Sequence, residues 1–185
     1  MIVIAGCGIF TLVMAALHVL RPDLPALERG MSRYAGGGTL MHATIAFLAL
    51  ASAWVALANQ LRTTPRARIP LNVAAVGLVG VAATPIGGPS PHAIVLLVHT
   101  IGGLLFYVGT ARAMLAAPVA GNAKRPFLVV YFTALSLFAL GGIGMPPISD
   151  AVGLLQRIVF ATALLWALRC GRRSTTGTAG RTSTS

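Results

Sequence analysis

Six long apolar segments, separated by short polar breaks, constrain this chain of 185 residues more than any other feature. They lie near residues 2–20, 39–61, 69–85, 92–117, 126–145 and 151–168. A helix needs roughly 20 apolar residues to cross the hydrocarbon core of a bilayer, which is about 30 Å thick. Only 9% of the residues are charged, against roughly 25% in a soluble domain. The sequence therefore predicts an all-α, polytopic membrane bundle of six transmembrane helices.

The breaks between these segments contain proline, which lacks a backbone donor, and glycine, which adopts non-helical dihedral angles easily. We expect one transmembrane domain over residues 1–173. The first segment has no basic start, and it is longer than the roughly 7–15 apolar residues of a signal peptide, so we expect it to be retained. Residues 174–185 are small and polar, which predicts a disordered tail.

Basic residues are unevenly distributed among the breaks. Fourteen Lys and Arg face three acidic residues, for a net charge of +11, but they are scattered in short groups, which argues against nucleic-acid binding. Ten of them lie beyond the second, fourth and sixth segments, counting Arg112 near the end of the fourth, three follow the first, and Arg157 lies inside the sixth. Cytoplasmic loops carry the excess of Lys and Arg. We therefore expect a protein of the bacterial cytoplasmic membrane with both termini in the cytoplasm.

This topology places all acidic residues and all histidines toward the outer side of the membrane. An arginine inside a span needs a polar partner, and Asp150, seven residues before Arg157, is the nearest candidate. We predict a site in this outer region. Its predicted catalytic residues are Glu28, Tyr34, His99, Asp150 and Arg157, and its predicted substrate-binding residues are Arg21, Asp23, Arg33, His42, His92 and Gln156.

Three stretches resemble a family, namely LRPDLPALERGMSRYAGG, PIGGPSPHAIVLLVHTIGGLLFY and GLLQRIVF. In this order they are similar to the bacterial six-helix membrane family known as domain-of-unknown-function nine-nine-eight. The motifs are Arg21-Pro22, Ser32/Tyr34/Ala35, His99 and Gln156-Arg157. The sequence departs from the family pattern at Arg33, where an acid is common, and in TPIGGP, which lacks an Asp. The resemblance implies six helices, and it implies no activity because the family has none assigned.

The leading functional hypothesis is an outer-side site that binds or converts a lipid-like or isoprenoid substrate entering from the membrane. In an enzyme of this kind, similar in mechanism to a terpene cyclase (a lyase or isomerase), Asp150 or Glu28 would donate a proton to an alkene or leaving group. His99 or Tyr34 would later remove one. The expected partners are membrane lipids and a hydrophobic small molecule, with no cofactor.

Two alternatives remain open at the level of sequence. Imidazole is a common ligand, so His42 and His99 would be the residues to hold a haem or a metal ion. A non-catalytic accessory subunit of a membrane complex requires no special residue at all. Neither the oligomeric state nor the substrate follows from the residues.

Overall fold

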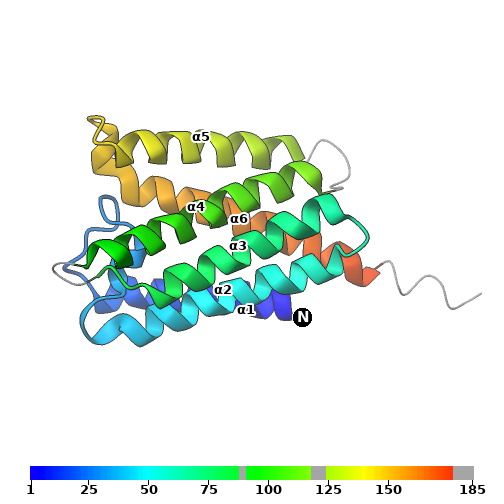
Figure 1. Cartoon of the computed structure of the whole chain (residues 1–185), viewed down its shortest axis with the longest axis horizontal. Coiled ribbons are helices and arrows are strands. Elements are labelled where there is room, and N and C mark those ends of the chain that lie inside the picture. The colour runs from blue at the N-terminus through cyan, green and yellow to red at the C-terminus, as the bar shows by residue number, and fades with distance from the viewer. Residues whose placement is uncertain (88–90, 118–123, 177–185) are drawn as a thin grey trace, which may run out of the picture.

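The computed structural model describes residues 1–87, 91–117 and 124–176. Within this part of the chain, six helices are long and apolar enough to cross a membrane. They are α1 (Ile2–Leu20), α2 (Leu40–Gln60), α3 (Pro65–Ala83), α4 (Ala93–Ala116), α5 (Lys124–Gly142) and α6 (Val152–Thr176). Figure 1 shows them running side by side along one axis. The predicted all-α membrane bundle is confirmed.

The helix ends differ from the predicted spans where a helix continues into polar sequence. Helix α3 begins at Pro65, four residues before the predicted start, and Pro65 occupies its first turn, where a missing N–H group is tolerated. Helix α6 continues to Thr176, so residues 174–176 are helical and not part of a disordered tail. Residues 177–185 lie outside the described part. Apolar length locates only the stretch inside lipid, whereas a helix can extend beyond it.

The order of packing leaves α5 at one edge of the bundle. Successive helices pack together from α1 to α4, and α5 packs mainly on α6, with only slight contact to α4. Helix α6 also contacts α1 and α2, and it therefore connects α5 to the first two helices of the bundle. Phe160 of α6 lies in the core, with ring centroids 4.8 Å from Phe106 and 5.3 Å from Phe10.

Helices α3 and α4 approach each other through glycines. A Cβ atom added to Gly77 would overlap the carbonyl oxygen of Gly102, and one added to Gly102 would lie 2.7 Å from the carbonyl oxygen of Gly77. Further along the same interface, a Cβ on Gly109 would lie 2.6 Å from the carbonyl oxygen of Pro70. Small residues of this kind allow helix backbones in membranes to touch. Gly77 and Gly102 therefore allow α3 and α4 to pack in direct backbone contact.

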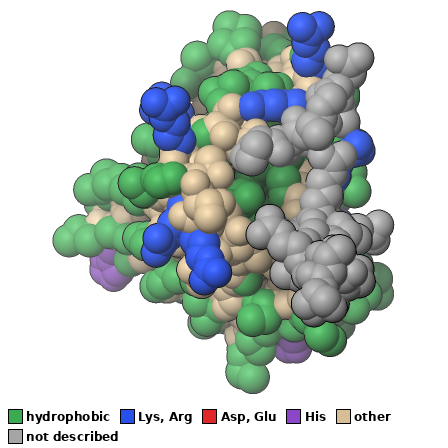
Figure 2. Space-filling view, turned by 90° about the vertical axis from the view of Figure 1, so that its right-hand side faces the viewer, with side chains coloured by type: hydrophobic (Ala, Val, Ile, Leu, Met, Phe, Trp, Pro, Cys, Tyr) green, Lys and Arg blue, Asp and Glu red, His purple; other side chains and the backbone are tan. Residues whose placement is uncertain are grey.

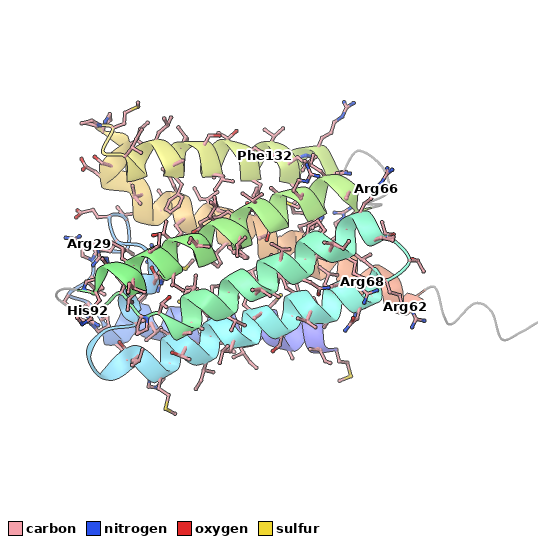
Figure 3. All side chains as sticks on the ribbon, viewed as in Figure 1. Arg29, Arg62, Arg66, Arg68, His92 and Phe132 are labelled. Atoms are coloured by element: carbon pink, nitrogen blue, oxygen red, sulfur yellow. The ribbon has the colours of Figure 1, made fainter. Side chains whose placement is uncertain are left out.

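The two ends of the bundle differ in charge. At one end, which we call the basic end, lie Arg62, Arg66 and Arg68 (Figure 3), and Figure 2 shows this face with its Lys and Arg side chains. The N-terminus lies at the same end (Figure 1). The opposite end, which we call the loop end, holds the segments 21–39, 84–87, 91–92 and 143–151, and the acidic residues lie in the first and last of these.

Candidate functional site

The first loop, residues 21–39, folds over the start of α6. It contains two short 3₁₀ helices, η1 (Met31–Tyr34) and η2 (Gly37–Thr39). The backbone N–H of Leu154 donates to the carbonyl oxygen of Leu27 at 3.0 Å. A Cβ on Gly153 would lie only 2.5 Å from the carbonyl oxygen of Ala26. Glycine at position 153 therefore lets the loop backbone lie directly on the helix.

Arg157 fixes the loop to both α6 and α1. Its Nε donates to His18 Nε2 at 3.0 Å, and its Nη2 donates to the hydroxyl of Tyr34 at 3.0 Å. Its Nη1 donates to the carbonyl oxygens of Arg29 and Gly153 at 3.0 and 2.7 Å. Each of the three guanidinium nitrogens thus has an acceptor. Arg157 is a positioning residue of the loop, and the structure does not place it on the cavity described below.

The partner predicted for Arg157 was wrong. Among the described residues the ion pair is between Arg21 and Asp23, and the side chain of Asp150 interacts instead with the hydroxyl of Ser149 at 3.4 Å. The prediction assumed that positions 150 and 157 share one α-helical face. However, Asp150 belongs to a 3₁₀ helix, η3 (Ile148–Ala151), and α6 begins only at Val152. A 3₁₀ turn contains fewer residues, so the α-helical spacing does not carry across this junction.

His18 is the partner that sequence reasoning missed. Its Nδ1 lies 2.6 Å from the carbonyl oxygen of Met14, to which it donates, so Nε2 is left as the acceptor for Arg157. The ring centroids of His18 and Tyr34 are 5.0 Å apart, and the Arg157 guanidinium carbon lies 5.8 Å from the Tyr34 ring centroid. No sequence spacing links positions 18 and 157, because their contact depends on how α1 meets α6.

Arg21 and Asp23, predicted to bind substrate, hold the beginning of the loop. Two guanidinium nitrogens of Arg21 donate to the two carboxylate oxygens of Asp23 at 2.8 and 2.7 Å. The third donates to the carbonyl oxygen of Gly36 at 2.8 Å, which ties the first residue of the loop to its end. The hydrogen bonds from Arg21 hold the pKa of the Asp23 carboxyl below its usual range.

A cavity of about 490 Å³ lies between α4, α5, α6 and the first loop, and Phe47 of α2 and Leu78 and Val81 of α3 also line it. Its volume is within the roughly 300–1,000 Å³ of small-molecule sites. Aliphatic and aromatic side chains form most of its wall, with Leu104 and Phe106 from α4, Leu135 and Phe138 from α5, and Phe160 from α6. The cavity is therefore suited to hydrocarbon.

Six polar residues also line this cavity, namely Ser32, Arg33, His99, Thr100, Tyr107 and Gln156. Gln156 accepts from the backbone N–H of Met31 at 2.6 Å and donates to the hydroxyl of Tyr107 at 2.9 Å. His99 donates from Nδ1 to the carbonyl oxygen of Thr84, 2.7 Å away. Sequence reasoning predicted Arg33, His99 and Gln156 and missed Tyr107, whose apolar surroundings in α4 gave no signal of a polar role.

The remaining predicted residues do not meet in this cavity. Glu28, Asp150, His42 and His92 are exposed and are not among the residues that line it. No carboxyl group therefore lies along the described wall, where acid-initiated chemistry would need a proton donor. His99 lines the cavity and His42 does not, so this cavity does not bring together the two residues predicted to hold a haem.

The fold and the cavity define a multi-pass membrane protein with an apolar site beside its outermost helix. Comparisons with protein-family models, with curated proteins and with solved structures found no match to this chain. The resemblance to domain-of-unknown-function nine-nine-eight stays a prediction. The function must therefore be argued from the cavity itself.

Proposed function

We propose that this protein binds a lipid-like molecule in the cavity between α4 and α5. The observation that carries the proposal is the side on which the cavity opens. Leu104 and Val108 line it, yet they are 60% and 50% exposed, and both lie near the middle of α4. In a bilayer this exposed surface faces hydrocarbon. A ligand would therefore enter sideways from the membrane.

The composition of the wall favours binding over conversion. An isoprenoid or another chain of hydrocarbon matches the aromatic and aliphatic side chains, and the few polar groups at one end would orient it. The predicted cyclase-like conversion needs an acid, and the described wall offers none. We therefore propose a lipid-binding membrane protein, with conversion of the bound molecule as a separate step to be tested.

The binding proposal can be tested with a photoactivatable fatty acid in membranes that contain the full chain. Crosslinks are expected on α4 and α5, near Leu104, Leu135 and Phe138. Gly103→Leu should reduce them by about tenfold, equal to about 1.4 kcal/mol, because Gly103 lines the cavity and a Cβ there meets only the Tyr107 ring at 3.8 Å.

Gly8→Leu provides the matched control, because a Cβ on this α1 glycine meets nothing within 4 Å and Gly8 is not among the residues lining the cavity. Labelling that Gly103→Leu and Gly8→Leu leave equally strong would contradict the proposal. A complete absence of saturable labelling would favour the accessory-subunit alternative.

We also propose that the basic end faces the cytoplasm of a bacterial cell and that the cavity lies toward the outer leaflet. The gathering of Arg62, Arg66 and Arg68 at the end that holds the N-terminus supports this orientation. An impermeant maleimide applied to intact cells should label Asp150→Cys and not Arg66→Cys, in a chain whose native Cys7 and Cys170 are replaced by alanine. Labelling of Arg66→Cys alone would reverse the orientation.

A further inference from the structure

Arg33 lies at the loop end of the cavity, and the described residues engage little of its guanidinium. The residue lines the cavity and is exposed. Among the described residues its side chain makes one long hydrogen bond, from Nη1 to the carbonyl oxygen of Ile86 at 3.4 Å. A guanidinium presents five N–H donors in a planar fork that matches carboxylate and phosphate oxygens. The described residues therefore leave most of the donor capacity of Arg33 open to a ligand.

Two other arginines at this end, Arg21 and Arg157, have structural roles. Arg21 is engaged by both oxygens of Asp23 and by the carbonyl oxygen of Gly36. Arg157 donates to His18, to Tyr34 and to two carbonyl oxygens. Both side chains hold the loop in place, and neither lines the cavity. Arg33 alone of these three combines a place on the cavity wall with donors that the described residues leave open.

The charge around Arg33 favours a negative ligand group. No carboxylate lines the cavity within the described part of the chain. The nearby polar side chains on the wall include Ser32 and His99, and His99 uses Nδ1 to bind the carbonyl oxygen of Thr84. An uncompensated cation beside an apolar cavity attracts an anion that carries a hydrocarbon chain.

The length of the cavity wall along α4 can accommodate part of the hydrocarbon chain of such a ligand. The part of the wall that α4 contributes between Thr100 and Val108 is about 12 Å long, at 1.5 Å of rise per residue. It runs along α4 (Ala93–Ala116) from its first half to its middle. An amphiphile could therefore place its head at Arg33, near the interface, and its chain beside α4.

We propose that the cavity selects an amphiphile with an anionic head group, a carboxylate or a phosphate, which binds to Arg33 while the hydrocarbon chain lies between α4 and α5. This inference rests on the proposed lipid-binding function and adds the class of ligand. It also assigns Arg33 as the residue that determines head-group specificity.

Energy transfer from tryptophan to parinaric acid, a fluorescent fatty acid, can test this selection on the purified full chain in neutral detergent. The chain contains two tryptophans, Trp54 and Trp166, both buried in the bundle. Bound parinaric acid would be displaced by oleate, by oleyl phosphate or by oleyl alcohol, which share one chain and differ in the head. The two anions should displace it at concentrations about tenfold lower than the alcohol, which corresponds to one ion-assisted contact.

Arg33→Gln should weaken the probe and both anions by about tenfold, and so remove this difference, while the dissociation constant of the alcohol, corrected for the affinity of the probe, stays unchanged. Arg29→Gln is the matched control, since Arg29 lies on the same loop, is exposed and does not line the cavity. It should keep the preference for anions. A preference for only one of the two anions would support the inference and identify the head group.

Equal displacement by all three compounds in the unmodified protein would overturn the selection while leaving the proposed binding intact. The same loss of preference in Arg29→Gln and Arg33→Gln would also overturn it, since a general surface charge would then suffice. Failure of parinaric acid to bind at all would refute the proposed function itself.

Discussion

The two faces of α4 are built in opposite ways. Toward α3, the backbone of Gly102 touches the backbone around Gly77, and the two helices pack along their length. Toward α5, the neighbouring Gly103 faces the cavity, and a Cβ there would meet only a ring atom of Tyr107 at 3.8 Å. One helix therefore forms a closed interface and an open one at adjacent positions.

The difference follows from the side chains that each interface contains. Hydrocarbon tails are as apolar as leucine, so helices in a membrane associate through close contact and not through the hydrophobic effect. Small residues allow that contact between α3 and α4. Leu135 and Phe138 of α5 are too large for it, and they line a cavity instead. Because α4 and α5 do not pack in direct contact there, a ligand can bind between them.

The largest expected effect is the difference in the free energy of unfolding between Gly102→Ala and Gly103→Ala. Both changes add one methyl group to α4 and gain the same helix propensity. The first places a Cβ 2.7 Å from the carbonyl oxygen of Gly77, where backbone must shift, and it should lower the free energy of unfolding by about 3 kcal/mol. The second should leave it unchanged or raise it by up to about 1 kcal/mol. Unfolding in mixed detergent micelles measures both.

Equal stabilities of these two variants would break the comparison, because both faces of α4 would then tolerate a side chain. Gly109→Ala serves as a second probe of the closed interface, since its Cβ would lie 2.6 Å from the carbonyl oxygen of Pro70. It should resemble Gly102→Ala.

A smaller effect is expected for the arginines that belong to the packed and the open regions. Arg157→Gln leaves the acceptors on His18 and Arg29 without their donor, and it should lower the free energy of unfolding by about 2 kcal/mol. Arg33→Gln should change it by less than about 0.5 kcal/mol, as for an ordinary surface substitution. Comparable losses in the two variants would mean that Arg33 also holds the loop. It would then be less available to a ligand.

The smallest effect concerns the exposed pair of Arg21 and Asp23, which contacts neither interface of α4. The pKa of Asp23 is lowered in the folded protein by its hydrogen bonds to Arg21, so its contribution to stability is complete above the ordinary pKa of an aspartate. The contribution is lost as the pH falls through the lower pKa of the folded state. The stability difference between the unmodified protein and Asp23→Asn should therefore shrink on acidification, whereas exposed Glu28→Gln should show little difference throughout.

The sequence predicted the bundle well because apolar length and proline positions act locally. It predicted the partners in the loop end poorly. The contact of Arg157 with His18 joins residues 139 positions apart, and the change from a 3₁₀ helix to an α-helix at Val152 moved Asp150 off the expected face. It did predict Arg33, His99 and Gln156 as polar residues at this end, yet the cavity that they share depends on how far α5 lies from α4. That spacing is a property of the packed helices and not of any one segment.

Native mass spectrometry of the protein released from its membrane tests most directly whether the open interface of α4 and α5 holds a membrane amphiphile. We predict that the unmodified chain and Gly8→Leu retain an anionic amphiphile of defined mass, and that Gly103→Leu does not. An unmodified chain without any bound amphiphile, or one retained equally by Gly103→Leu, would contradict the account.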